Sequence, residues 1–137
     1  MEELSSLLPV LRAVLAEGPP LHLAVLFGSA ARGRTHPGSD VDVAIWPQSP
    51  ELPLDAELDL QMALERAVGR PVDLLRLDEA STMVCWEVAA HGVPIVAATA
   101  AAWPRFVARA ASEWADFRPA LEEAARRFQR RLAEPLS

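Results

Sequence analysis

The stretch that decides the fold is residues 21–46, which read LHLAVLFGSAARGRTHPGSDVDVAIW. Residues 21–27 are almost wholly apolar and too few for a typical helix, so they predict a buried strand. Residues 28–33 (GSAARG) predict a turn into a brief helix, and residues 35–39 predict a loop. Residues 40–46 predict a second strand, with acids on one face and β-branched side chains on the other. A strand, a Gly-Ser turn and an acid-bearing strand therefore form the expected centre of the fold.

The flanking sequence predicts further helices and strands in alternation. Each prediction uses apolar spacing together with stop signals such as Gly18-Pro19-Pro20 and Gly69 with Pro71. In chain order, the expected elements are a helix over 4–15, a helix over 54–68, a strand over 72–77 that carries Asp73, a helix capped by Asp78 or Ser81 and ending near His91, and a short edge strand over 93–97. This order is typical of an α/β chain in which helices cover a small sheet.

The C-terminal third has aromatic and apolar residues close to one helical stripe, from Phe106 to Phe128. Pro119 interrupts this stripe, and we expect a kink or break there, with Pro119 near the first turn of a new helix. The stripe has two readings, a core face or a face left open for a partner. The length of 137 residues suits a single domain, with a core at about 1–97 and C-terminal helices at about 98–133.

Composition excludes several classes of chemistry. All 13 cations are Arg and the net charge is -6, which disfavours a general nucleic-acid or anionic-membrane binder. The absence of Lys excludes a Walker A loop, a kinase-type lysine and a Schiff base. One cysteine, Cys85, permits no disulfide within the chain. No stretch has the pattern of a signal peptide or a membrane span, so we expect a cytoplasmic protein.

Three acids form the candidate catalytic group. Asp40 and Asp42 lie two residues apart on one strand, so their side chains point to the same face. If the strand carrying Asp73 lies beside them, the three carboxylates can converge on a pair of divalent cations. Hard oxygen ligands suit Mg²⁺, which is commonly shared with substrate phosphates. Asp73 could then orient or deprotonate an attacking hydroxyl. The plainer alternative for Asp73 is a solvated acid near a strand edge.

The Gly28-Ser29 turn is the candidate phosphate site. Glycine permits close backbone approach, and free N–H groups at the start of a helical turn favour a polyphosphate. Ser29 adds a hydroxyl, although it could serve only as a helix cap. Arg32 could balance charge on departing phosphates or form a surface salt bridge.

The pattern Gly28-Ser29-x-Ala31-Arg32-Gly33, Ser39-Asp40-x-Asp42 and the later strand acid resembles the DNA polymerase β superfamily of nucleotidyltransferases. It is most similar to the prokaryotic minimal nucleotidyltransferases (MNT). The segment containing Asp116-Phe117-Arg118-Pro119 also resembles their antitoxin-type members. The resemblance implies a small mixed sheet of three to four strands in a polymerase β-like fold.

The resemblance also implies a function. Two Mg²⁺ ions would be held by Asp40, Asp42 and Asp73, and ATP would bind at Gly28, Ser29, Arg32 and Ser39. The chain would transfer AMP to a hydroxyl and release pyrophosphate. In antitoxin-type members the acceptor is a tyrosine of a helical HEPN ribonuclease toxin, so the partner expected here is such a toxin.

Two other functions stay open at this stage. The chain could be a binding module that masks its toxin without catalysis, which its small size and aromatic C-terminal face allow. It could also be a small-molecule nucleotidyltransferase whose acceptor site comes from a separate subunit. The three intact acids favour catalysis, whereas the preferred nucleotide and the stoichiometry leave no sign in the sequence.

Overall fold

The computed structural model describes residues 2–33 and 39–135 of the chain. Within these residues the chain forms five helices and four strands. Their bounds are α1 (Glu2–Ala16), β1 (Leu21–Phe27), α2 (Gly28–Ala31), β2 (Val41–Pro47), α3 (Leu54–Val68), β3 (Val72–Arg76), α4 (Thr82–His91), β4 (Val93–Ala97) and α5 (Ala102–Ala133). The predicted order of elements is confirmed, except in the C-terminal third. Most of the predicted loop at 35–39 lies outside the described residues.

The four strands form one mixed sheet in the order β3-β2-β1-β4. β1 is the antiparallel neighbour of both β2 and β4, while β2 and β3 run parallel. The sheet confirms the expected α/β class and the three to four strands. The edge position of β4 accommodates Pro94, which has no N–H to donate to a ladder.

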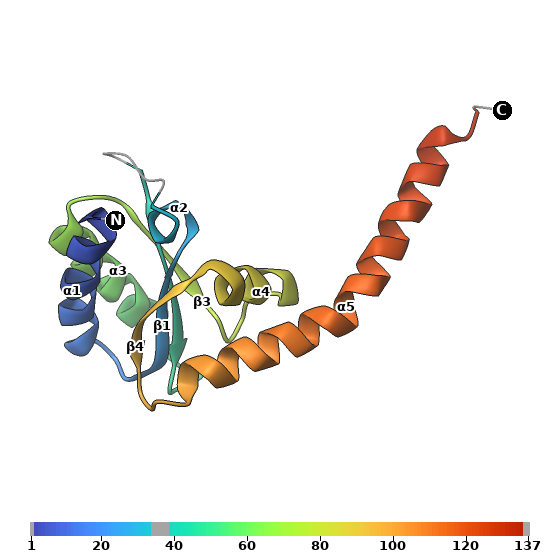
Figure 1. The fold of residues 1–137 in the computed structure, drawn as a ribbon. Helices are drawn as coiled ribbons and strands as arrows, with labels where there is room; N and C mark the ends of the chain where they lie inside the picture. Colours follow the sequence, from blue (N-terminus) through green and yellow to red (C-terminus); the bar gives the residue numbers. More distant parts are fainter. Residues whose placement is uncertain (1, 34–38, 136–137) are drawn as a thin grey trace.

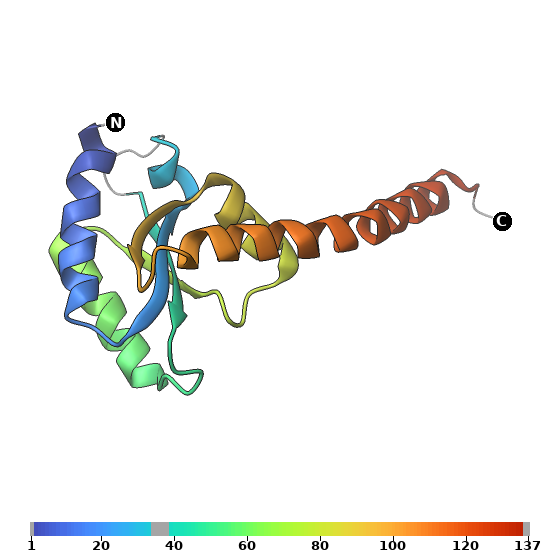
Figure 2. The same ribbon diagram turned by 60° about the horizontal axis from the view of Figure 1, so that its bottom comes forward.

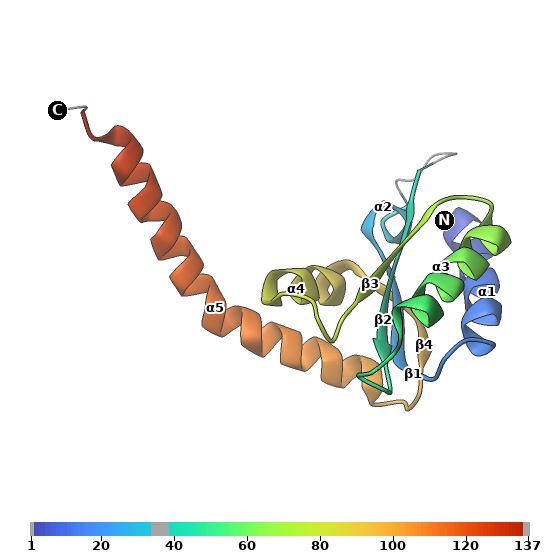
Figure 3. The same ribbon diagram turned by 180° about the vertical axis from the view of Figure 1, so that it is seen from behind.

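Helices cover both faces of this sheet (Figure 1; Figure 3 shows the opposite side). α1 and α3 pack on one face, where Leu11 and Leu64 are fully buried with Val43 and Ile45 of β2. Burying each leucine contributes roughly 1.5–3 kcal/mol. α4 and α5 pack on the other face, through Val88 of α4 and Phe106 of α5. The alternation along β2 thus sends the β-branched residues toward α1 and α3, as the sequence predicts.

The helix ends follow the predicted signals. Gly69 ends α3 in the left-handed region (φ 72°), and its N–H donates to the Glu65 carbonyl. Ser81 caps α4 by accepting a hydrogen bond from the Val84 N–H at 3.2 Å, which decides between the two predicted caps. None of the helices in the described part of the chain is both long and apolar enough to cross a lipid bilayer.

The C-terminal third corrects one prediction. Instead of two helices separated near Pro119, the structure has a single helix of 32 residues, α5, with Pro119 inside it. The helix bends along its length and its second half projects away from the sheet (Figures 1 and 2). The missing N–H of proline removes one backbone hydrogen bond without ending the helix. Of the predicted kink or break, the kink is therefore confirmed, and the prediction that a new helix starts near Pro119 is wrong.

Candidate functional site

The parallel pairing of β2 and β3 brings two of the predicted acids together. Asp42 and Asp73 are direct register partners in this pairing. Partners in adjacent strands are about 5 Å apart and point to the same face of the sheet. That face carries α4 and α5, because the flanking Val41 and Val43 pack toward α1 and α3. The expectation that β3 lies beside the acid-bearing strand is therefore met.

Asp40 adds a third negative charge at the start of β2. Its side chain is exposed, as is that of Asp73, whereas Asp42 is half-buried. The pKa of Asp42 is raised, first by its partial burial and then by the charges of Asp73 and Asp40. A cation that binds between these like charges relieves their repulsion. This set of oxygen donors therefore fits a hard divalent cation.

The carboxylates are close enough to repel but are not gathered into a ligand cluster. Among the residues described, no group of three or more His, Cys, Asp or Glu side chains is arranged to hold a metal ion. The strands fix the backbone positions of Asp42 and Asp73. The exposed side chains of Asp40 and Asp73 remain able to adopt other rotamers.

The glycine of the Gly-Ser turn lies directly beside the acids. Phe27, at the end of β1, is the register partner of Asp42. Gly28 follows with a φ of 74°, and a Cβ at this position would overlap the Asp42 carboxylate. Both the backbone conformation and the contact thus require glycine here. The turn enters α2 against the acid-bearing end of the sheet.

Ser29 stands exposed in the first turn of α2. The residue before this turn, Phe27, supplies no side-chain cap. The first N–H groups of a helix have no partner within the helix, so this turn offers backbone donors next to the acids. Ser29 does not act as the N-cap residue, which was the plainer of its two predicted roles.

Arg32 pairs with an acid that no sequence motif marks. Its guanidinium donates to Glu87 of α4 at 3.2 Å, and both side chains are substantially exposed. His91 lies 3.9 Å from the same carboxylate, one turn further along α4. The structure therefore shows the salt-bridge arrangement for Arg32, while its exposure leaves the guanidinium able to exchange Glu87 for another anion.

Ser39 has an anchoring position at the entry to β2. Its carbonyl accepts a hydrogen bond from the Arg70 Nε at 3.0 Å, and Arg70 also pairs with Glu3 of α1. The Val41 N–H donates to the Pro71 carbonyl at 2.9 Å. These bonds connect the segment that carries Asp40 to the start of β3, so they help to hold the two acid-bearing strands in register.

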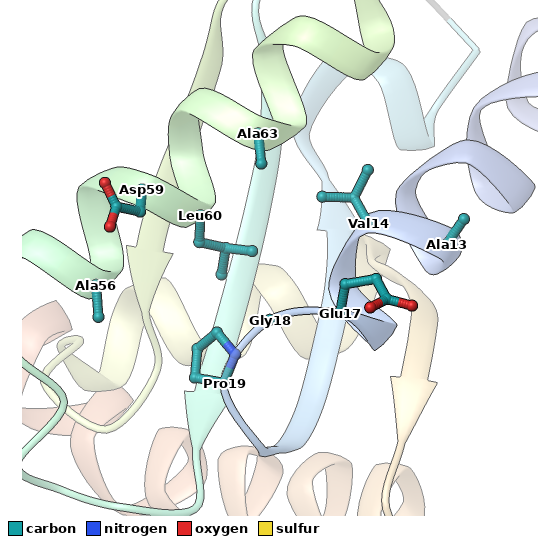
Figure 4. A pocket seen from close by; sticks show the side chains of 9 residues that line it. All are labelled: Ala13, Val14, Glu17, Gly18, Pro19, Ala56, Asp59, Leu60 and Ala63. Carbon is teal, nitrogen blue, oxygen red and sulfur yellow. The ribbon is translucent and has the colours of Figure 1, made fainter.

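A hollow lies away from these acids, between α1 and α3 (Figure 4). Its volume is about 660 Å³ and its lining is mainly apolar, with Val14, Pro19 and Leu60 among its walls. Glu17 and Asp59 are its charged members. None of the predicted site residues lines it.

Known proteins that are similar to this chain show which family it belongs to. The family model described as "Polymerase beta, Nucleotidyltransferase" matches residues 10–100. Among characterised relatives, the protein adenylyltransferase MntA of Shewanella oneidensis is 38% identical over 74 residues, which are 54% of this chain and 52% of MntA. This alignment spans about half the length of that relative.

Two solved structures illustrate the shared fold. A toxin–antitoxin crystal structure with AMP-PNP has a TM-score of 0.73 and 27% identity, and the match covers 86% of this chain and 98% of that one. The MNT antitoxin complex with the tri-AMPylated HEPN toxin of Shewanella oneidensis has a TM-score of 0.62 and 24% identity, with coverages of 90% and 96%. At 24% identity the second match speaks for the fold alone.

The family match and the structural match assign this mixed sheet and its helices to the class of proteins with a nucleotidyltransferase fold. The family match covers well over half of the chain. The chain belongs to the polymerase beta nucleotidyltransferase family, and its fold is that of the minimal nucleotidyltransferases.

Proposed function

We propose that this protein is a Mg²⁺-dependent adenylyltransferase and an antitoxin. It transfers AMP from ATP to a tyrosine hydroxyl of a HEPN-type ribonuclease toxin in the cytoplasm. Support comes from the family match, from the 38% identity to the adenylyltransferase MntA, and from the similarity to a toxin–antitoxin structure with AMP-PNP. The single observation that carries the proposal is the register pairing of Asp42 with Asp73, beside Gly28.

In this proposal Asp40, Asp42 and Asp73 hold the two Mg²⁺ ions. When bound, Mg²⁺ neutralises phosphate charge and lowers the pKa of the acceptor hydroxyl. Partial burial raises the pKa of Asp42, and the charges of Asp73 and Asp40 raise it further. The repulsive part supports this role, since three carboxylates that repel one another attract a cation to this end of the sheet.

The remaining residues bind and orient the reactants. Gly28 lets the triphosphate approach the backbone of the turn, and Ser29 donates its hydroxyl to a phosphate oxygen. Ser39, at the entrance to β2, also contributes to binding ATP. Arg32 turns from Glu87 to the departing phosphates. The acceptor oxygen bonds to the α-phosphorus as the bond to the β-phosphate bridging oxygen breaks. Pyrophosphate leaves, and the hydroxyl proton passes to Asp73.

The test is incubation of the chain with Mg²⁺, ATP labelled in the α-phosphate and the product of the neighbouring gene. We expect label on the partner with the wild type and at least 100-fold less with Asp42→Asn, about the loss expected when charge stabilisation is removed. Asp59→Asn, an exposed acid on α3, is the matched control and should label the partner normally. Equal labelling by wild type and Asp42→Asn would reject the proposed site.

A second function, masking of the partner without catalysis, is favoured by one observation. The projecting half of α5 exposes large apolar side chains, including Phe128 and Leu132. The double variant Asp40→Asn/Asp42→Asn separates the two functions in cells that produce the toxin. Loss of protection supports catalysis, and full protection at equal expression supports masking.

A further inference from the structure

The distal part of α5 carries an apolar stripe. No other element of the described chain buries it. We define the stripe as Phe117, Leu121, Phe128 and Leu132. These residues are four or seven positions apart, which places them on one side of a helix. Phe117, Phe128 and Leu132 are 40%, 60% and 71% exposed. A helix that leaves such side chains in water has a face suited to a partner.

The polar side of the same helix is satisfied within the chain. Arg118 pairs with Glu122 at 2.9 Å, and Arg126 and Arg127 both pair with Glu123. Each of these exposed pairs adds little to the stability of the helix. These pairs support a helix in water but do not cover the stripe, so the apolar side is the part left without a contact.

The stripe is continuous with the packed part of the molecule. Trp86 of α4 stacks on Trp114 of α5 with ring centroids 6.4 Å apart, and Trp114 contacts Phe117 at 6.1 Å. An aromatic row therefore leads from the α4 side of the sheet onto the projecting helix. In Figure 1 the bend turns this half of α5 upward, and α2 lies at the upper end of the sheet in the same view. A partner held on the stripe would sit on the α4 side, the side that Asp42 and Asp73 face.

Charge indicates what kind of partner fits. Residues 118–134 carry five of the 13 arginines and three glutamates, so their local net charge is +2 in a chain whose net charge is -6. The tip of α5 is thus a local basic end that complements acidic side chains around an apolar groove. A second copy of this chain is the wrong occupant for the proposed reaction, because the chain contains no tyrosine to accept AMP.

We propose that the stripe on α5 is the docking arm for the toxin partner, which receives it in an apolar groove bordered by acidic residues. This inference rests on the proposed function, since it names the surface that brings the acceptor tyrosine to the acids. Docking is a helix-in-groove contact, with Phe128 and Leu132 as its outer anchors.

The test compares two double variants of the full chain with the product of the neighbouring gene as the probe. Phe128→Ser/Leu132→Ser removes the outer anchors. Leu54→Ser/Leu58→Ser removes two exposed leucines of α3 and is the matched control. We expect the stripe variant to bind the partner at least tenfold more weakly, with a raised KM for the partner and an unchanged kcat at saturation. The control should stay within twofold of the wild type.

Hydrogen exchange supplies a second readout that does not depend on the variants. Residues 115–133 should exchange quickly in the free wild type and become protected in the complex, whereas protection of residues 102–111 should change little. Unchanged exchange in the complex, equal binding by the stripe variant, or no binding of the partner by the wild type would each overturn the docking arm. So would a wild-type dimer that the stripe variant converts to a monomer.

The outcomes separate the two proposals. Asp42→Asn should bind the partner as tightly as the wild type while losing transfer. Binding through the stripe without any AMP transfer would reject the adenylyltransferase activity and keep the docking arm. If the stripe variant transfers AMP as well as the wild type does, the docking arm is rejected and the adenylyltransferase activity is kept.

Discussion

Gly28 packs so closely on Asp42 that a Cβ at position 28 would overlap the carboxylate. The contact joins the end of β1 to the acid on β2. The register partner of Asp42 on β3 is Asp73. Gly28 also has a φ of 74°, a conformation that L side chains rarely adopt. One residue thus sets both the shape of the turn and the space available to the acid.

Gly28→Ala should therefore damage both stability and activity. The positive φ costs about 1–2 kcal/mol for a residue with a Cβ, and the methyl group must also displace the Asp42 carboxylate. We expect a loss of at least 1 kcal/mol in the free energy of unfolding in urea, and a large fall in AMP transfer to the partner.

The matched control for this change is Gly69→Ala. Gly69 has a nearly identical φ of 72°, but no atom lies within 4 Å of the place that a Cβ would take. It should lose about 1 kcal/mol from the backbone strain alone and keep full activity after correction for folded protein. If both variants transfer AMP equally well, the contact with Asp42 has no role in the reaction.

Asp42→Asn should stabilise the fold in the absence of divalent cations. Partial burial and the charges of Asp73 and Asp40 raise the pKa of Asp42, so the folded chain favours the neutral carboxyl more than the unfolded chain does. The contribution of this group to stability is fully present below its unfolded pKa and is lost as pH rises through the folded pKa. The variant should match the wild type near pH 3 and exceed it in stability at about pH 7.

Thermal unfolding at several pH values, in chelator and then in Mg²⁺, measures this effect. Mg²⁺ should raise the Tm of the wild type and leave that of Asp42→Asn almost unchanged, because a ligand stabilises only the state that binds it. Asp59→Asn should behave as the wild type does in both media. A wild type that is more stable than Asp42→Asn in chelator at neutral pH would contradict the repulsion.

Much of the fold was accessible from the sequence because its signals are local. The helix over 54–68 was predicted with its observed bounds, since Gly69 and Pro71 give an unambiguous stop. The strand over 21–27 was also correct, because seven nearly continuous apolar residues suit a strand buried on both faces. The neighbouring position of Asp73 was correctly anticipated from the acid pattern together with the family resemblance.

The features that the sequence did not reveal depend on contacts between distant residues. The pairing of Arg32 with Glu87 joins residues 55 positions apart, and nothing in the local pattern around Glu87 marks it. The hollow between α1 and α3 likewise depends on how two helices meet. Pro119 is correctly read as a kink or a break, but a proline signal does not decide between them, because it says that a hydrogen bond is lost and not whether the helix continues.

Arg32→Gln should raise the KM for ATP while changing stability little. The bridge to Glu87 is between exposed side chains, so its loss should cost less than about 1 kcal/mol. If the guanidinium turns to the phosphates during the reaction, its removal weakens ATP binding several-fold. Glu87→Gln is the counterpart and should leave the KM unchanged or lower it, since it releases Arg32. Equal increases in KM for both variants would assign Arg32 to the salt bridge alone.

Pro119→Ala should straighten α5 and impair transfer to the partner more than binding. Proline inside a helix costs about 3 kcal/mol relative to alanine, so helix content by circular dichroism and protection of the distal half should both increase. Small-angle scattering should report a longer particle as the bend relaxes. If the bend aims the docking arm, the kcat for the partner should fall while Kd changes less than about threefold, an effect below about 0.7 kcal/mol. Pro104→Ala is the matched control, because Pro104 lies in the first turn of α5, where the N–H has no partner within the helix. A straightened helix with undiminished transfer would show that the stripe, and not its direction, is what the partner needs.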